Sequence, residues 1–114
     1  FLVILSIFPT LVTAVELLMV REDNCPWCMV WDDEIAPIYS KTPEGKFAPL
    51  VYVELSQSIE DIRILESVIY TPTFILVKNG AEIARLEGYP GEDFFWTLLE
   101  EMLIENTDYK DPTK

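Results

Sequence analysis

The chain of 114 residues contains no histidine and only two cysteines. The absence of histidine excludes nucleophiles that depend on an imidazole base, and it excludes metal sites built on histidine. Basic residues are also scarce, because 8 Lys and Arg stand against 20 Asp and Glu and give a net charge of -12. A surface this acidic argues against nucleic acid and anionic membranes as partners. Half of the residues are hydrophobic, which is enough for the core of one domain.

The longest uncharged stretch lies at the amino end, in residues 1–15 (FLVILSIFPTLVTAV). Its apolar part is shorter than the roughly 18 residues that a membrane span needs. The small residues at 12–14 are typical of a signal-peptidase site. We therefore expect residues 1–14 to be a truncated signal peptide, cleaved after Ala14, and residues 15–114 to form the mature domain. A retained anchor and a strand of the mature domain are the alternatives. Export would place the cysteines in an oxidising compartment.

Strands and helices alternate after this segment. The apolar run VELLMV at 15–20 predicts a buried strand. Residues 26–39 predict a helix, because large apolar side chains recur there at helical spacing and proline is tolerated in a first helical turn. Pro37 should kink or end this helix, since it lacks a backbone N–H. The proline and glycine of residues 40–46 predict a loop.

The second half of the chain continues the alternation. Asn79-Gly80 is a strong hairpin signal, because a type I′ turn needs positive φ at both positions. The resulting order, β-α-β-α-β-β-α, predicts an α/β domain with a central mixed sheet of about four strands flanked by helices. The predicted elements are a strand over 49–55, a weaker helix over 56–68, strands over 73–78 and 81–87, a helix over 92–105, and a frayed polar tail over 106–114.

The two cysteines, Cys25 and Cys28, flank Pro26 and Trp27 at the predicted start of a helix. A helix amino end carries free N–H groups and the positive end of the macrodipole, which favour a thiolate on the first cysteine. Such a thiolate attacks a partner disulfide, and a thiol one helical turn later resolves the mixed disulfide. The pattern predicts a redox-active dithiol in which Cys25 attacks and Cys28 resolves. Trp27 is then either a wall that faces the substrate or an ordinary surface aromatic.

A cysteine pair also has uses without catalysis. A zinc site usually takes four ligands, and the chain has neither a third cysteine nor a histidine to supply them. The acidic run at 32–34 has no partner ligands in the sequence, so we expect no metal and no cofactor. A non-catalytic binding module with a structural disulfide stays open, and so does a disulfide oxidase or isomerase.

A second feature is the proline at position 72, immediately before the apolar run 73–78. A proline in a central strand removes a donor from the ladder, so its presence conflicts with the predicted strand. The conflict is resolved if the Thr71–Pro72 bond is cis and opens the strand. The backbone before Pro72 would then be free to pair with a substrate.

On these residues the chain resembles the thioredoxin superfamily over about residues 15–104. The resemblance rests on CPWC after a strand, Pro37 late in the following helix, YTPTF at 70–74, and the Lys78-Asn79-Gly80 hairpin with a glycine eight residues on. It implies a thioredoxin-like fold and the activity of a thiol-disulfide oxidoreductase.

The resemblance also implies roles for individual residues. Cys25 matches the attacking cysteine and Cys28 the resolving one. Pro72 matches the cis-proline that faces the disulfide, and Thr71 matches the residue whose backbone pairs with substrate. Gly88 matches the loop glycine that flanks the peptide groove, and Pro26 and Trp27 are expected to border the same groove.

Two stretches, WDDEIAPIYSKTPEGKFAPL and TPTFILVKNGAEIARLEGYPGEDFFWTLL, are similar to the SoxS-type periplasmic thioredoxins of bacterial sulfur-oxidation gene clusters. This likeness implies reduction of a disulfide on a periplasmic partner protein, such as the sulfur-carrier complex of that pathway. We expect a membrane-bound thiol donor to restore the reduced state. We expect a monomer. Met19 and Asn24 differ from cytosolic thioredoxins, which have a buried acid and a tryptophan at these positions.

Overall fold

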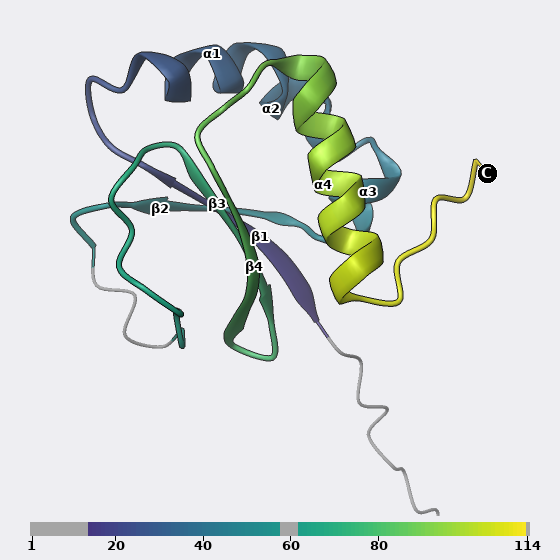
Figure 1. Cartoon of the computed structure of the whole chain (residues 1–114). Coiled ribbons are helices and arrows are strands. Elements are labelled where there is room, and N and C mark those ends of the chain that lie inside the picture. The colour runs from purple at the N-terminus through teal and green to yellow at the C-terminus, as the bar shows by residue number, and fades with distance from the viewer. Residues whose placement is uncertain (1–13, 58–61, 114) are drawn as a thin grey trace, which may run out of the picture.

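The computed structural model describes residues 14–57 and 62–113 (Figure 1). The expected signal peptide therefore lies outside the described residues, apart from Ala14. No helix in the described part of the chain is long and apolar enough to cross a bilayer. The elements are β1 (Val15–Arg21), α1 (Pro26–Glu34), α2 (Ala36–Tyr39), α3 (Pro43–Phe47), β2 (Leu50–Glu54), β3 (Thr73–Lys78), β4 (Ala81–Glu87) and α4 (Glu92–Asn106).

The four strands form one mixed sheet in the order β2-β1-β3-β4. Strand β1 pairs with β2 in parallel and with β3 antiparallel, and β3 pairs antiparallel with β4. The predicted mixed sheet is confirmed. The turn between β3 and β4 has positive φ at Asn79 (53°) and Gly80 (75°), as its sequence predicts, and the Thr71–Pro72 bond is cis.

Alternate residues of the central strands face opposite sides of the sheet, since successive side chains of a strand point to opposite faces. One side, here called the helix-covered face, packs against α1 and α4 and contains most of the core. The other, called the loop-covered face, packs against the chain around residues 62–68. The strand residues of the helix-covered face are Leu17, Met19, Phe74 and Leu76, and those of the loop-covered face are Leu18, Val20, Ile75 and Val77.

The helix predicted over 56–68 is wrong for the residues that the structure describes there. Residues 62–68 form an irregular segment, while 58–61 lie outside the described residues. The N–H of Arg63 donates to the Gly80 carbonyl at 2.9 Å, and the Arg63 carbonyl accepts from the N–H of Glu82 at 2.8 Å. The backbone therefore takes its partners from the β3–β4 hairpin instead of from its own next turn.

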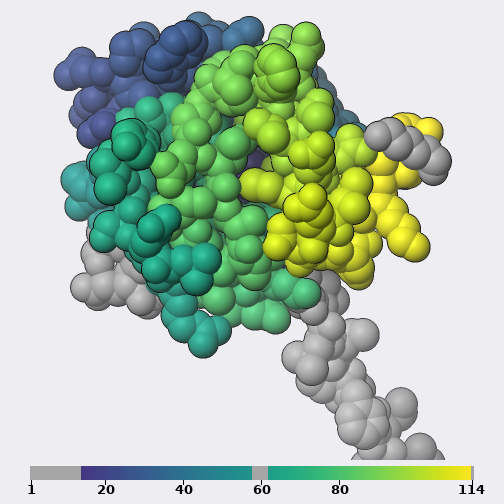
Figure 2. All heavy atoms as spheres, in the orientation of Figure 1, coloured from purple at the N-terminus to yellow at the C-terminus, as the bar shows by residue number. Residues whose placement is uncertain are grey.

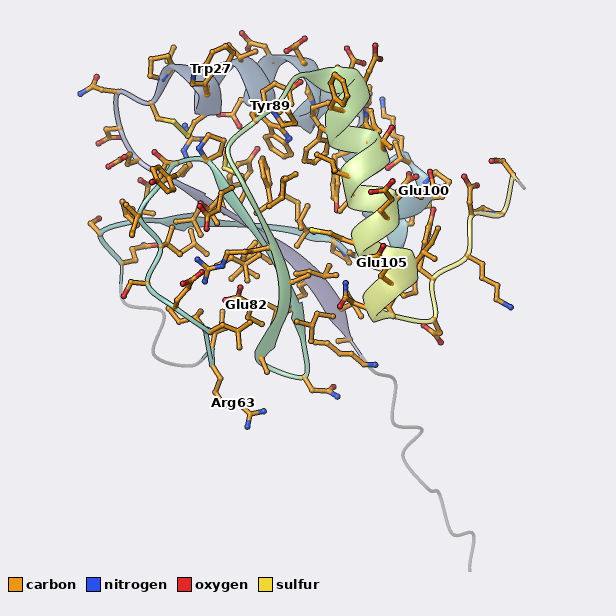
Figure 3. All side chains as sticks on the ribbon, in the orientation of Figure 1. Trp27, Arg63, Glu82, Tyr89, Glu100 and Glu105 are labelled. Atoms are coloured by element: carbon orange, nitrogen blue, oxygen red, sulfur yellow. A yellow bond between two sulfur atoms is a disulfide. The ribbon has the colours of Figure 1, made fainter. Side chains whose placement is uncertain are left out.

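The Glu82 side chain fixes the same segment. Its carboxylate accepts from the N–H of Leu65 at 3.0 Å and from Nε of Arg85 at 2.6 Å. Arg85 in turn donates to the Glu66 carbonyl at 2.7 Å. Figure 3 shows Glu82 beneath the sheet, beside the segment that carries Arg63. This part-buried ion pair, and not a helix, therefore holds the segment in place.

The predicted helix over 26–39 is divided at Ile35. Helix α1 ends at Glu34, and Pro37 lies in the first turn of α2, where its missing N–H costs no hydrogen bond. The predicted loop over 40–46 is partly wrong, because Pro43 begins the short helix α3, which Thr42 caps. Its Gly45 is needed for space, since a Cβ there would lie 1.7 Å from the Tyr39 carbonyl oxygen.

The carboxyl end is better packed than predicted. Helix α4 buries Phe95, Leu99 and Leu103 against the helix-covered face. The tail after it is not frayed throughout, because Tyr109 is buried and its ring centroid lies 5.2 Å from that of Phe47. Figure 2 shows the yellow atoms of the tail beside those of α4, which run from green to yellow.

Candidate active site

Cys25 lies immediately before α1 and caps its amino end. Its sulfur is bonded to that of Cys28, and the two Cα atoms are 5.2 Å apart. The backbone N–H of Cys28 donates to Sγ of Cys25 at 3.1 Å. An N–H group of the helix amino end thus points at the sulfur of the first cysteine. The same arrangement stabilises a thiolate there once the disulfide is reduced.

The two cysteines differ in exposure. Cys25 is 6% exposed, whereas Cys28 is 0% exposed. Pro26 and Trp27 between them are exposed, and Trp27 is 60% exposed. Figure 3 shows Trp27 at the outer side of α1. The solvent-exposed surface beside the disulfide is therefore made mainly by Pro26 and Trp27, with a small contribution from Cys25.

The cis-proline loop lies at the same edge of the sheet as the disulfide. The pairing of Val20 with Thr73 places Pro72 beside the end of β1, where the chain leads to Cys25. The Oγ1 hydroxyl of Thr71 donates to Oε1 of Glu22 at 2.7 Å. This bond joins the cis-proline loop directly to the loop between β1 and α1.

Gly88 completes the site from the end of β4. Its N–H donates to the Pro72 carbonyl at 2.7 Å, and its φ of +83° favours glycine. The next residue, Tyr89, donates its hydroxyl to Oε1 of Glu34 on α1 at 3.1 Å. Burial, together with the hydrogen bond to Glu34 and its charge, raises the pKa of Tyr89 to about 12. Figure 1 shows both connections, before β3 and after β4, rising toward α1.

An ion-pair network holds α1 against the sheet below this site. Nη1 of Arg21, at the end of β1, donates to Oδ2 of Asp32 on α1 at 2.6 Å. The Tyr52 hydroxyl of β2 donates to the other oxygen of Asp32 at 3.2 Å. The hydrogen bond to Asp32 raises the pKa of Arg21, while burial opposes this shift. The helix that carries the cysteines is therefore bonded to two strands.

The structure places the residues expected at the site on three loops at one end of the sheet and at the start of α1: Cys25, Pro26, Trp27, Cys28, Thr71, Pro72 and Gly88. No motif marks Glu22 or Tyr89, because their partners are 49 and 55 residues away in the chain. Met19 is fully buried in the core of the helix-covered face. Asn24 has a φ of 60°, a backbone conformation that asparagine tolerates better than most residues.

A group of three carboxylates lies away from the disulfide. Glu44 of α3, Glu100 of α4 and Asp111 of the tail have ligand atoms within 4.8 Å of one another. Exposed acidic groups of this kind are common without a bound ion. None of the three residues belongs to α1 or to the loops around the cysteines. No metal role is assigned to them.

A disulfide that caps a helix after the first strand, beside a cis-proline that opens an antiparallel strand, defines a thiol-disulfide oxidoreductase of thioredoxin-like fold. The order of the strands and the helices packed on the sheet agree with that class. Comparison with known proteins gives the family more narrowly.

Among solved structures, the chain is similar to the periplasmic thioredoxin SoxS from Paracoccus pantotrophus in its reduced form. The two are 40% identical with a TM-score of 0.78, over 80% of this chain and 97% of that one. A thioredoxin-2 of a malaria parasite, described as a component of its protein secretion machinery, is 25% identical with a TM-score of 0.57, over 78% of this chain and 84% of that one. Fasciola hepatica thioredoxin shares the fold. It is 18% identical with a TM-score of 0.57, over 78% of this chain and 81% of that one. No protein-family model and no curated protein matches the chain.

The chain belongs to the thioredoxin superfamily and, within it, resembles SoxS-type thioredoxins. The predicted superfamily, fold and class of reaction are thereby confirmed.

Proposed function

We propose that this protein is an exported thioredoxin that reduces a disulfide on a partner protein, with Cys25 as the attacking thiol and Cys28 as the resolving thiol. The main observation behind this proposal is that the two cysteines differ in exposure and in hydrogen bonding. Cys25 has the only exposed surface of the two and accepts the N–H of Cys28, whereas Cys28 is fully buried. Cys25 is therefore the cysteine that a partner can reach and the one whose sulfur the helix amino end stabilises as a thiolate.

The proposed reaction starts from the reduced dithiol. The Cys25 thiolate attacks one sulfur of the partner disulfide, which breaks and leaves as a thiolate while a mixed disulfide forms on Cys25. Cys28, after losing its proton, attacks Sγ of Cys25 and releases the second partner sulfur as a thiolate. Two electrons pass to the partner, whose two thiolates take up two protons, and the protein ends with the Cys25–Cys28 disulfide seen here. A dithiol donor must then reduce that disulfide for the next cycle.

We place the partner strand against the cis-proline loop. Thr71 lies before the first residue of β3, so its backbone stands outside the paired strands of the sheet. Pro72 and Gly88 are joined by a hydrogen bond of 2.7 Å, which gives the proposed groove one fixed wall. Pro26 and the exposed Trp27 form the opposite border.

We assign the protein to the periplasm, with residues 1–14 as its export signal. The similar SoxS protein of Paracoccus pantotrophus is a periplasmic thioredoxin, and residues 1–15 carry no charge. By the same likeness, we propose a partner in a sulfur-oxidation pathway, such as its carrier protein, and a membrane-bound thiol donor. A monomer stays a prediction.

Two single variants test the roles of the cysteines. In an insulin-reduction assay with a dithiol donor, Cys25→Ser should abolish activity. Cys28→Ser should instead accumulate a mixed disulfide, which mass spectrometry should locate on Cys25. Activity retained by Cys25→Ser, or an adduct that forms on Cys28 in preference to Cys25, would overturn the assignment.

A further inference from the structure

We propose that Glu22 is a positioning residue that holds the cis-proline loop in register with Cys25 through the hydroxyl of Thr71. This inference rests on the proposed function, because the distance that it controls matters only when a partner strand and its disulfide bind together. The Thr71 hydroxyl donates to the Glu22 carboxylate at 2.7 Å.

Glu22, the acceptor of this hydrogen bond, directly follows a well-held strand residue. It follows Arg21, whose carbonyl accepts from the N–H of Leu55 at 2.7 Å and whose guanidinium is bonded to Asp32. It precedes Cys25 by three residues, which span at most about 11 Å of extended chain. Glu22 therefore directly follows a strand residue that is held by hydrogen bonds, and only a short piece of chain separates it from the proposed attacking cysteine.

Thr71, the donor of the hydrogen bond, follows an exposed segment without regular structure. The residues before it, Ile69 and Tyr70, are 74% and 60% exposed and belong to no helix or strand. Gly88 anchors the loop toward β4, not toward the cysteines. Among the hydrogen bonds of the described residues, the one between Glu22 and Thr71 alone joins the cis-proline loop to the loop between β1 and α1.

The expected consequence concerns binding geometry more than chemistry. A partner strand paired with the Thr71 backbone must present its disulfide to Sγ of Cys25, so the offset between the two loops decides whether one binding mode satisfies both contacts. Loosening the loop adds unproductive arrangements of the bound partner. It leaves the helix amino end, which acts on Cys25 itself, in place.

The variants must distinguish the effect of the Glu22 charge from the effect of its hydrogen bond to Thr71. Glu22→Gln removes the charge but keeps an oxygen that accepts from the Thr71 hydroxyl, whereas Glu22→Ala removes both. Thr71→Val removes the donor and keeps the shape of the side chain. Glu105→Ala, an exposed carboxylate at the far end of α4 (Figure 3), is the matched control for loss of one negative charge.

The test is the steady-state reduction of insulin by the full chain. Glu22→Ala and Thr71→Val should each raise the KM for insulin about three- to ten-fold, the range of one lost hydrogen bond, while kcat changes less than about two-fold. The double variant should be no worse than either single variant, because both remove the same interaction. Glu22→Gln and Glu105→Ala should retain the KM of the original protein.

Each other result counts against the inference. An unchanged KM in Glu22→Ala means that the bond does no positioning. A KM in Glu22→Gln as high as in Glu22→Ala means that the charge, and not the bond, matters. Additive effects in the double variant mean that the two residues act separately. If the original protein reduces no insulin, the proposed function fails first; if it does and Glu22→Ala behaves like it, only the positioning role fails.

Discussion

The two faces of the sheet are built by alternate residues of the same strands, yet they are covered in different ways. The helix-covered face buries an aromatic cluster in which the Trp31 ring centroid lies 5.2 Å from that of Phe74 and 5.8 Å from that of Phe95. The loop-covered face buries four aliphatic strand residues under an irregular segment. That segment is fixed by the ion pair of Glu82 and Arg85.

This difference separates the site from its support. Helix α1, which carries Cys25 and Cys28, packs on the helix-covered face through the fully buried Trp31. No residue of α1 packs on the loop-covered face. The geometry of the disulfide should therefore depend on the aromatic cluster, whereas the ion pair should affect stability alone. Four variants test this comparison.

The largest effect is expected for Trp31→Ala on the helix-covered face. Removal of a fully buried indole should lower the free energy of unfolding by about 3–5 kcal/mol. It should also change the reduction potential of the Cys25–Cys28 pair, because Trp31 anchors α1 three residues after Cys28. Urea unfolding and equilibration with a redox buffer measure the two quantities. Trp27→Ala, at a 60% exposed site, is the control with little expected loss of stability.

Arg85→Ala should lower the free energy of unfolding by about 2–3 kcal/mol, because it leaves the buried Glu82 carboxylate without its charged donor. The reduction potential should stay unchanged, since no hydrogen bond or ion pair among residues 14–57 and 62–113 joins Arg85 or Glu82 to α1. Arg63→Ala removes an exposed arginine of the same segment and should change stability by less than about 0.5 kcal/mol. A shifted potential in Arg85→Ala would show that the two faces are not independent.

The loop-covered face should also be sensitive to acid. Burial alone would raise the pKa of Glu82, but hydrogen bonds from Arg85 and from the N–H of Leu65, with the charge of Arg85, lower it below the ordinary 4.5. A lowered pKa in the folded state means that the carboxylate contributes fully above pH 4.5 and loses its contribution as pH falls through the lowered value. Unfolding followed from about pH 6 to about pH 3 should show a smaller loss of stability in Glu82→Gln than in the original protein. Equal losses would contradict the role of Glu82.

The smallest effect is expected for Tyr89→Phe, which removes the hydroxyl bonded to Glu34 and keeps the ring beside Phe95. The loss should be about 1 kcal/mol. In a Glu34→Ala background the same change should cost much less, because its partner is already gone. A full loss in that background would assign the stabilisation to something other than this bond.

The parts of the molecule that sequence predicts well are those decided locally. The apolar runs of the strands, the Asn79-Gly80 turn and the start of α1 at the cysteine pair each carry their signal within a few residues. The cis bond before Pro72 followed from a local conflict between a proline and a strand. These local signals include every residue proposed for the reaction itself.

The parts that sequence predicted wrongly depend on distant contacts. The aliphatic spacing in 56–68 fits a helix, but its described residues bond to β4 through Glu82 and Arg85, about twenty positions on. The short helix α3 was predicted as a loop because its proline and glycine are breakers elsewhere. In α3 the proline lies in the first turn and Gly45 gives room to Tyr39.

The reduction potential of the Cys25–Cys28 pair tests the central claim most directly. The oxidised protein is equilibrated with dithiol buffers of known potential. The fraction of reduced protein is then measured by thiol alkylation and mass spectrometry. A working redox couple should titrate between about -270 and -120 mV. A value below about -300 mV, typical of structural disulfides, would contradict the account.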